Sequence, residues 1–381
     1  MTVSVVQAMK VTLSRDSLSP ALAALSHVVE RRNTIPVLSN ILLRAEGPSL
    51  TLRATDLDIE AQSALPAEVA APGAITVPAH TLADIVRKLP AGAQITLEQD
   101  AKATSLTAKS GRSRFVMHTL PESDFPDITA GELPHRFVMP AKTVVDLIDK
   151  VSFAISSEET RYYLNGIYLH VAEIEGAPRM RAVATDGHRL SRLELPAPEG
   201  SVGMPGVIVP RKAVTEIARL AKDAEGDLTI ELSATKIRVT SSETSLTSKL
   251  IDGTFPDYER VIPRSNDKLA TLAAEDFAKA IDRVATISSE RGRAVKLSLS
   301  DAGLALSVTN PDSGEAREEL EADYDGDPID MGFNARYLLD VLGVVGGGDT
   351  VLMKLADPGS PALFQRSEGD ALLVVLMPMR V

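Results

Sequence analysis

The sequence of 381 residues contains no cysteine and no tryptophan, and aromatic side chains make up only 4% of it. The lack of cysteine excludes disulfide bonds, thiolate nucleophiles and thiolate metal sites. The six histidines are scattered singly, without a His-x-x-x-His spacing, and there is no Gly-x-Ser-x-Gly motif. These absences argue against zinc-dependent and serine hydrolases, and we predict no bound metal and no cofactor.

Long hydrophobic runs are also absent. No stretch approaches the roughly 18 apolar residues of a membrane span. Met1–Ala8 lacks the basic start and the long apolar core of a signal peptide. We therefore expect a cytoplasmic protein without a membrane partner.

The net charge of −12 at first argues against a nucleic-acid partner, because phosphate is attracted by positive surface. The charge is unevenly distributed, however. The six predicted helices carry a slight excess of Lys and Arg, whereas the strands and loops are acidic. Helices turned toward a polyanion would attract phosphate even in an acidic protein. The alternative, that so small an excess has no meaning, stays open.

The chain is built from repeats. Ala-Thr-Asp follows a predicted strand at residues 54–56 and again at 184–186, and Thr309-Asn310 stands at the matching place in the last third. Around these phrases the order strand, helix, three strands occurs six times. This pattern favours an α+β protein of three similar domains, which we place at residues 1–133, 134–266 and 267–381.

The predicted helices follow residues that favour a helix start. Proline supplies a preset φ and asparagine a capping oxygen. These residues stand at the strand-to-helix junctions Pro78, Pro140, Pro210 and Asn334. Repeats with one helix and several strands allow the sheets to form one layer and the helices another.

The densest polar chemistry lies in Ala184-Thr185-Asp186-Gly187-His188-Arg189-Leu190. We predict a strand, a tight Asp-Gly turn that presents His188 and Arg189, and a second strand. Asp186 with His188 could form an acid–base pair, but a turn-stabilising or ligand-binding role agrees better with the isolated histidine.

Two further segments have a binding interpretation and a structural one. The run 161–166, Arg-Tyr-Tyr-Leu-Asn-Gly, places a cation beside two aromatic rings, which suits contact with a nucleic-acid strand. The same tyrosines could instead cover a domain edge. The carboxy-terminal run 374–381 contains Met-Pro-Met, and it predicts either a peptide-binding groove or a buried edge strand.

These segments together resemble a known family, the bacterial sliding clamp or beta subunit of DNA polymerase III. The resemblance covers about residues 9–381. Five motifs in the same order carry it: Ala184–Leu190, Arg161–Gly166, Ile208–Lys212, Phe255–Tyr258 and Met377–Arg380.

The resemblance implies a head-to-tail homodimeric ring of six domains, with helices lining a hole and sheets outside. Such a ring is a processivity factor rather than an enzyme: it encircles double-stranded DNA and tethers the replicative polymerase. The implied partners are the DNA polymerase III alpha subunit, the clamp loader delta subunit, and other polymerases and repair proteins that carry short Gln- and Leu/Phe-containing clamp-binding motifs. Two rival hypotheses are an enzyme with an Asp186/His188 site and a peptide-binding scaffold unconnected with DNA.

Simple geometry favours a dimer for such a ring. Six helices spaced by roughly 10 Å form a circle about 19 Å across at the axes, whereas twelve form one about 38 Å across. Subtracting roughly 5 Å of helix radius on each side leaves about 9 Å or about 28 Å, and B-DNA is about 20 Å wide. Only twelve helices would admit a duplex.

The resemblance also implies site residues. The DNA contacts would be Arg32, Arg161, Tyr162, Tyr163 and Lys212. The ring-closing contact would include Thr286 and Ile287. The partner-peptide pocket would be formed by Leu164, Thr185, Gly187, His188, Arg189, Leu190, Pro256, Arg260, Val261, Asn334, Tyr337, Val375, Met377, Pro378, Met379 and Arg380.

The sequence departs from the family pattern at a helix start, at the amino-terminal segment and, in a small way, at Val381, where leucine is familiar. His80-Thr81 stands where the family carries an Arg-Lys pair at a helix start, which affects one expected DNA contact and part of the ring interface. Met1–Ala8 precedes the usual start of the family near Met9. We interpret this segment as either an alternative translation start or a disordered tail.

Overall fold

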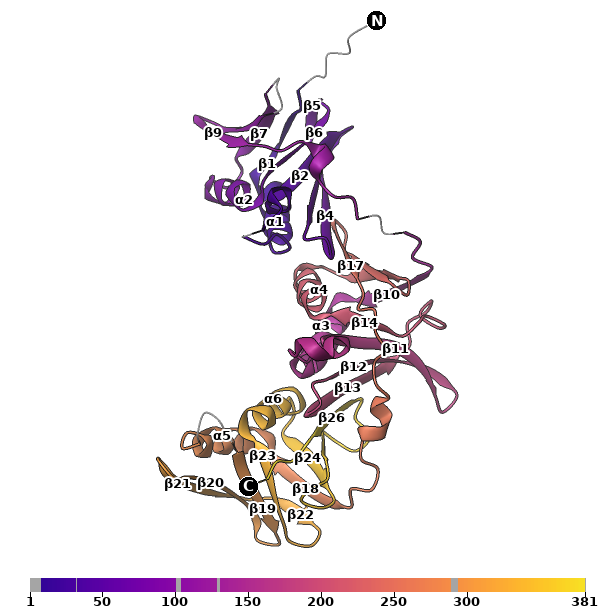
Figure 1. Cartoon of the computed structure of the whole chain (residues 1–381), viewed down its shortest axis with the longest axis vertical. Coiled ribbons are helices and arrows are strands. Elements are labelled where there is room, and N and C mark those ends of the chain that lie inside the picture. The colour runs from indigo at the N-terminus through magenta and orange to yellow at the C-terminus, as the bar shows by residue number, and fades with distance from the viewer. Residues whose placement is uncertain (1–7, 32, 101–103, 129–130, 289–293, 381) are drawn as a thin grey trace, which may run out of the picture. The chain divides into compact units, whose positions relative to one another are not determined.

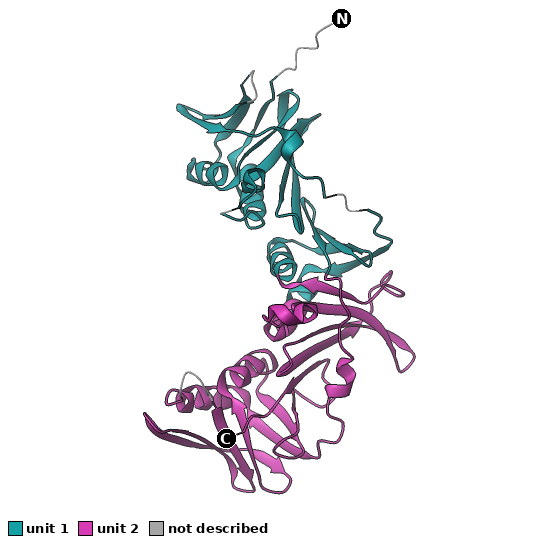
Figure 2. Cartoon of the chain, viewed as in Figure 1, with its two compact units in different colours: residues 1–145, 212–250 teal, residues 146–211, 251–381 magenta. Residues whose placement is uncertain are grey.

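The computed structural model describes residues 8–31, 33–100, 104–128, 131–288 and 294–380. The chain forms two compact units (Figures 1 and 2). Unit 1 comprises residues 1–145 and 212–250, and unit 2 comprises residues 146–211 and 251–381. The predicted middle domain, residues 134–266, contributes to both units.

Six α-helices are present in the described part of the chain. They are α1 (Arg15–Ser26), α2 (Ala79–Lys88), α3 (Ala141–Val151), α4 (Arg211–Asp223), α5 (Ala274–Ala285) and α6 (Ala335–Val345). Asn334 caps α6 as predicted, since its side-chain oxygen accepts hydrogen bonds from the backbone N–H groups of Arg336 and Tyr337. The prolines stand one residue before α2, α3 and α4 rather than inside them.

The element order confirms the sixfold repeat of strand, helix and three strands. Two short strands were missed by the sequence analysis, β5 (Glu68–Ala71) and β22 (Asp323–Asp325). Each pairs at the edge of a sheet, β5 with β1 and β22 with β18. Both are too short to show an alternating pattern, so tertiary pairing rather than local sequence creates them.

Unit 1 contains two antiparallel sheets. The first has the order β5, β1 (Lys10–Ser14), β7 (Gln94–Gln99), β8 (Ser105–Ser110), β9 (Ser113–His118). The second has the order β10 (His135–Pro140), β15 (Asp227–Leu232), β16 (Lys236–Thr240), β17 (Thr244–Lys249), β4 (Ile59–Pro66), β3 (Ser49–Thr55), β2 (Asn40–Glu46), β6 (Gly73–Pro78).

Unit 2 also contains two antiparallel sheets. The larger has the order β14 (Val207–Pro210), β11 (Gly166–Ile174), β12 (Ala177–Thr185), β13 (Arg189–Pro196), β26 (Leu372–Leu376), β25 (Ala362–Gln365), β24 (Thr350–Leu355), β18 (Lys268–Ala273), β22. The smaller has the order β21 (Gly314–Leu320), β20 (Gly303–Asn310), β19 (Ala294–Ser300), β23 (Ile329–Asn334).

Two strand pairings explain why the chain forms two units rather than three. β17 from the predicted middle domain pairs with β4 from the first, and β13 from the middle domain pairs with β26 from the third. Continuous sheets therefore cross both predicted domain boundaries. The boundaries at 133/134 and 266/267 remain predictions.

Helices cover the sheets and close the cores. In unit 1, α1 packs on α2 and on β1, β3 and β4. In unit 2, α5 and α6 pack on each other and on strands of both sheets. The buried side chains of α5, including Phe277, Ile281 and Val284, recur every three to four residues, as an amphipathic helix requires.

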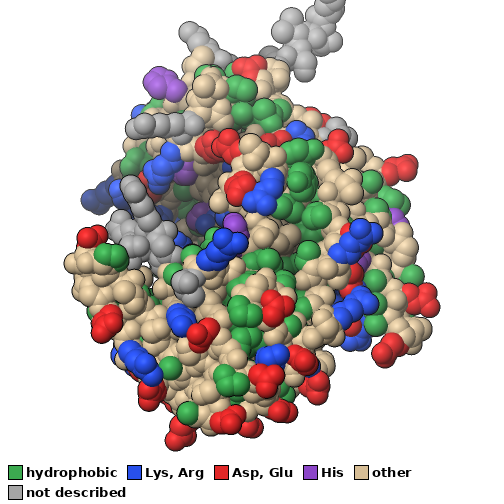
Figure 3. Space-filling view, turned by 60° about the horizontal axis from the view of Figure 1, so that its bottom comes forward, with side chains coloured by type: hydrophobic (Ala, Val, Ile, Leu, Met, Phe, Trp, Pro, Cys, Tyr) green, Lys and Arg blue, Asp and Glu red, His purple; other side chains and the backbone are tan. Residues whose placement is uncertain are grey.

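Charged side chains of both signs are interspersed on the face drawn in Figure 3. In the described ranges, no helix combines the length and the apolar character needed to cross a membrane.

Candidate functional site

The turn between β12 and β13 is held by hydrogen bonds among five consecutive residues. The Thr185 hydroxyl donates to the Arg189 carbonyl oxygen (2.8 Å) and accepts from the Gly187 N–H (3.1 Å). The Asp186 carboxylate accepts from the backbone N–H groups of His188 (2.9 Å) and Arg189 (3.0 Å). The Asp186 N–H donates to the Arg189 carbonyl, so the two central residues are Gly187 and His188 rather than the predicted Asp-Gly.

Gly187 makes this turn possible because its φ is +88°. A β-carbon there would lie 2.6 Å from Nη1 of Arg161, so the guanidinium packs against the turn. Asp186 binds backbone N–H groups and Arg189 rather than the His188 ring, which leaves no acid–base pair at this turn. The part of the chain that the structure describes holds no cluster of three or more His, Cys, Asp or Glu suited to a metal ion.

The first repeat contains the same turn between β3 and β4. Thr55 bonds the Ile59 carbonyl and the Leu57 N–H, and the Asp56 carboxylate accepts from the N–H groups of Asp58 and Ile59. Leu57 occupies the glycine position at a φ of +81°. A leucine in this conformation is strained. The repeated Ala-Thr-Asp predicts the shared turn, but it gives no sign of a leucine held at a positive φ.

Arg189 links the turn to two helical segments of unit 2. Its guanidinium donates to the Asp186 carboxylate (3.1 Å), the Asp340 carboxylate on α6 (2.6 Å) and the Phe153 carbonyl (2.8 Å). It also lies over the Tyr337 ring, 4.3 Å from its centroid. The Arg189 side chain is only 11% exposed, so these contacts hold it in one position. The predicted residue Tyr337 is thereby placed beside the turn.

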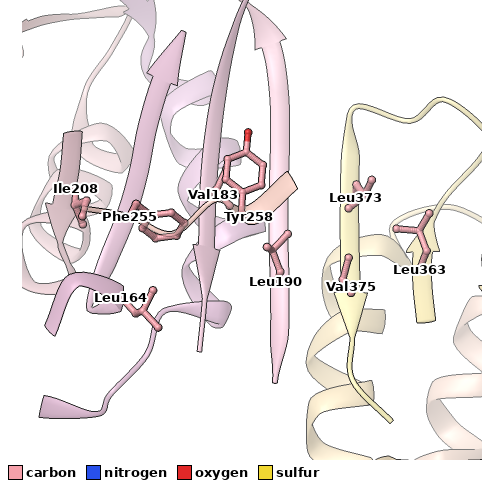
Figure 4. Close-up of a cluster of buried hydrophobic side chains, with 9 residues drawn as sticks. All are labelled: Leu164, Val183, Leu190, Ile208, Phe255, Tyr258, Leu363, Leu373 and Val375. Carbon is pink, nitrogen blue, oxygen red and sulfur yellow. The ribbon is translucent and has the colours of Figure 1, made fainter. Parts of the chain in front are cut away.

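A cluster of buried apolar side chains includes Val183 and Leu190, which lie on the two strands that the turn connects (Figure 4). It brings together strands β12, β13, β14, β25 and β26 with the 3₁₀ segments Glu159–Leu164 and Tyr258–Val261. Its members are Leu164, Val183, Leu190, Ile208, Phe255, Tyr258, Leu363, Leu373 and Val375. Three of these, Leu164, Leu190 and Val375, were predicted for the peptide pocket.

The pairing of β13 with β26 brings the chain end to this cluster. Leu190 pairs with Val375, and the Met377 N–H donates to the His188 carbonyl (2.8 Å). The Met379 N–H donates to the Gly332 carbonyl (2.9 Å). The terminal Met-Pro-Met segment therefore has a defined course in unit 2.

The predicted peptide-pocket residues differ in exposure. The buried ones are the three cluster members already named. The half-buried ones are Thr185, Arg189, Asn334, Tyr337, Pro378 and Met379. The exposed ones are Gly187, His188, Pro256, Arg260, Val261, Met377 and Arg380. Among the exposed apolar side chains, Val261 is 50% accessible and Met377 41%. We call this set of buried, half-buried and exposed residues the candidate peptide surface.

A layer of ionic contacts, which the sequence analysis missed, holds the segment that carries Arg260 and Val261. Buried Arg181 donates to Glu194 (2.7 Å) and to the Tyr258 hydroxyl (3.3 Å), and also pairs with Glu259. Burial raises the pKa of Tyr258 to about 12. His170 Nε2 lies 3.0 Å from the same hydroxyl, and burial, with Arg181 nearby, lowers the pKa of His170.

The candidate DNA residues of unit 2 lie together on the 3₁₀ segment Glu159–Leu164. The Arg161 guanidinium donates twice to the Glu158 carboxylate, at 2.8 and 2.6 Å. That hydrogen bonding lowers the pKa of Glu158. Tyr162 is exposed, and Tyr163 packs on the apolar cluster with its ring centroid 5.8 Å from that of Tyr162.

The other candidate DNA residues belong to unit 1. Lys212, at the start of α4, contacts the carboxylates of Asp56 and Glu30 through its ammonium group. Arg32 lies outside the described residues. His80, at the departure from the family pattern, has Nε2 3.1 Å from the Val29 carbonyl oxygen, a contact within unit 1.

The candidate ring-closing residues follow α5 directly. The Thr286 hydroxyl donates to the Asp282 carbonyl (3.2 Å), and the Ile287 carbonyl accepts from the Asn310 side chain (2.9 Å). Asn310 belongs to the third copy of the repeated turn, so this turn supports the end of α5.

Elsewhere in unit 2, a hollow of about 450 Å³ lies beside the β19–β20 hairpin. None of the predicted site residues lines it.

Family models match three consecutive parts of the chain. Their descriptions are DNA polymerase III beta subunit N-terminal domain for residues 9–129, central domain for 138–257 and C-terminal domain for 259–380. Each match contains two copies of the repeat.

Full-length relatives and solved structures agree with these matches. The Beta sliding clamp of Caulobacter vibrioides is 51% identical over 98% of this chain and 100% of its own length. The C. crescentus beta sliding clamp in its crystal structure is 51% identical, with a TM-score of 0.95 over 99% of this chain and 100% of that one. A clamp from Bartonella birtlesii bound to griselimycin is 47% identical, with a TM-score of 0.94 over 98% and 100%.

Proposed function

Because the chain belongs to the DNA polymerase III beta subunit family and is a DNA sliding clamp of replication, we propose that it closes as a head-to-tail homodimeric ring around duplex DNA. Members of this family are non-catalytic processivity factors. This conclusion replaces the hypothesis of an enzyme with an Asp186/His188 site. The observation that carries the proposal is the family match across all three pairs of repeats. A replication clamp acts on the bacterial chromosome, so we place the protein in the cytoplasm.

Two edge strands support the head-to-tail dimer. β9 ends the first sheet of unit 1 and carries Arg114 and the exposed Val116. β21 ends the smaller sheet of unit 2 and carries Glu315, Glu318 and Glu319 with one basic residue, Arg317. The excess of carboxylates on β21 opposes its pairing with its own copy, whereas pairing β9 of one subunit with β21 of another brings Arg114 to an acidic edge. Unlike edges that complement each other give a heterologous contact, which closes a ring when the rotation fits.

The dimer is tested by mass and by charge reversal. The wild-type chain should have a mass in solution of about 81 kDa, twice 40.6 kDa. Arg114→Glu should lower this mass toward the monomer, because it places a carboxylate opposite the acidic edge. Adding Glu315→Arg and Glu319→Arg in the same chain should restore the dimer. A monomeric wild type would contradict the ring.

Encirclement is tested by topology. The closed ring should stay on a nicked circular duplex and leave when the circle is linearised, because a ring can slide off only at an end. Equal release from both substrates would show simple affinity instead. The proposed DNA contacts are Arg32, Arg161, Tyr162, Tyr163 and Lys212. The three cations among them attract phosphate without reading sequence, as sliding requires.

We further propose that the candidate peptide surface binds the clamp-binding motifs of the polymerase III alpha subunit, the clamp loader delta subunit, and other polymerases and repair proteins. Exposed Val261 and Met377 beside a buried apolar floor suit the apolar side chains of a short motif. Polar and basic groups at the rim, His188 and Arg260, suit its polar atoms.

A matched pair of valines tests this surface. Val261→Ala should weaken the binding of a fluorescent Gln- and Leu/Phe-containing peptide by about tenfold, as expected for a contributing apolar contact. Val202→Ala, an equally simple truncation of a 63% exposed valine in unit 2, should leave affinity unchanged. Deletion of residues 377–381 should abolish binding while the dimer persists. Equal affinities in all variants would contradict the assignment.

A further inference from the structure

We propose that the carboxylates of Glu158, Asp56 and Glu30 mask the charge of the DNA-contacting cations Arg161 and Lys212, and so keep the clamp weakly attractive to phosphate. The inference rests on the proposed function, because it assigns to these carboxylates the task of setting DNA affinity. They are positioning residues: they act on DNA through the cations that they hold.

Arg161 is masked by an ion pair with two hydrogen bonds. Its Nε and Nη2 donate to the two oxygens of Glu158, at 2.8 and 2.6 Å. A phosphate would be gripped by the same parallel pair of N–H groups. The remaining amino group, Nη1, lies against Gly187. A DNA phosphate must therefore displace Glu158 or share Arg161 with it.

Lys212 is masked by two carboxylates of different mobility. Asp56 is anchored, since its side chain is 9% exposed and its Oδ1 accepts from the N–H groups of Asp58 (2.9 Å) and Ile59 (2.7 Å). Its Oδ2 contacts the Lys212 ammonium. Glu30 is 58% exposed and accepts from Lys212 at 3.3 Å, so it is the partner that a phosphate can replace.

The masking changes what DNA binding releases. A free cation that meets a phosphate releases a condensed counterion, which makes binding tight and strongly salt-dependent. A cation that exchanges a carboxylate for a phosphate gains less, because an existing ion pair is lost. For a topologically closed ring this is an advantage: encirclement provides retention, and weak contacts leave the ring free to slide.

The test compares DNA affinity and its salt dependence in dimers of full-length variants. Glu158→Gln frees Arg161 and should tighten binding to a fluorescent duplex by about two- to fivefold, the range expected for an exposed ion pair. The slope of log K against log salt should steepen by up to about 0.9, one phosphate contact. Glu30→Gln should change the DNA affinity and the salt slope in the same direction but by less, since Asp56 still holds Lys212.

Two control variants distinguish the loss of masking from a change in net charge and from a folding defect. Glu98→Gln makes the same change in net charge and breaks a comparable pair, Glu98 with Lys109 at 2.6 Å on β7 and β8. It should leave the salt slope unchanged. Glu158→Asp retains a carboxylate and should restore wild-type binding. Asp56→Asn would not isolate the masking, because Asp56 also holds its turn together.

The outcomes distinguish this inference from the proposed function. A Glu158→Gln variant that matches Glu98→Gln in affinity and slope would overturn the masking, even if the wild-type clamp is retained on nicked circles. Failure of the wild type to be retained on those circles would instead overturn the ring, whatever the slopes are. A steeper slope in Glu158→Gln but not in Glu98→Gln supports the masking.

Discussion

Arg189→Lys tests whether the contacts of the turn hold the candidate peptide surface in place. The arginine makes three hydrogen bonds in different directions, to Asp186, Asp340 and the Phe153 carbonyl, and lies on the Tyr337 ring. A lysine keeps the charge but has no planar fork, so it can retain one of these acceptors well.

The magnitude follows from what is lost. One hydrogen bond to a charged acceptor contributes roughly 1.5–3 kcal/mol and one to a carbonyl about 1 kcal/mol. Loss of the cation–π contact adds roughly 0.5–1 kcal/mol. Asp340 is partly exposed, and water compensates some of the loss, so we expect Arg189→Lys to lower the free energy of unfolding by about 2–3 kcal/mol.

The composition supplies a selective assay. The chain has six tyrosines and no tryptophan, and all six tyrosines lie in unit 2. A urea titration followed by tyrosine fluorescence therefore reports on the unit that contains Arg189. Protein concentration is held constant, because dimerisation shifts the midpoint.

Arg179→Lys is the matched control on the neighbouring strand. Arg179 makes a single bond of 3.2 Å to Glu194, so its loss should change stability by less than about 1 kcal/mol. Equal urea midpoints for Arg189→Lys and Arg179→Lys would refute the reasoning. Arg189→Lys should also weaken peptide binding, because Tyr337 loses its support.

Three further predictions concern backbone strain and pH. Leu57→Gly should stabilise unit 1 by about 1 kcal/mol in thermal unfolding followed by far-UV circular dichroism, since glycine adopts the positive φ without strain; a loss of stability would contradict this. Gly187→Ala should lower unit 2 stability and peptide affinity by about 1–3 kcal/mol, because its β-carbon meets Arg161, whereas Gly203→Ala, also at positive φ but with no neighbour within 4 Å, should leave peptide affinity unchanged. Burial lowers the pKa of His170, so the unfolded state binds more protons and unit 2 should lose stability as pH falls below about 6.5; an equal loss in His170→Asn would assign the effect to another group.

The sequence by itself determined the features that depend on neighbours in the chain. The sixfold repeat can be recognised because apolar residues recur at helical spacing in the helices and alternate with polar residues in the strands. The turn at residues 185–189 is similarly local, since its hydrogen bonds connect five consecutive residues. Composition left the segments 161–166 and 374–381 with two interpretations each. The full sets of residues assigned to DNA, peptides and ring closure came instead from family resemblance, and their functions remain proposals.

Only the tertiary structure decided what joins these local parts. The pairing of β13 with β26 connects residues about 185 positions apart, and it brings Val375 beside Leu190. Tertiary packing also forms the ion pairs of Arg181 with Glu259 and of Lys212 with Asp56, whose residues are distant in the chain. Charges and apolar periods mark such residues as buried or exposed, but they do not specify partners across so long a chain. Packing of the whole unit selects those partners, and with them the masked cations and the candidate peptide surface.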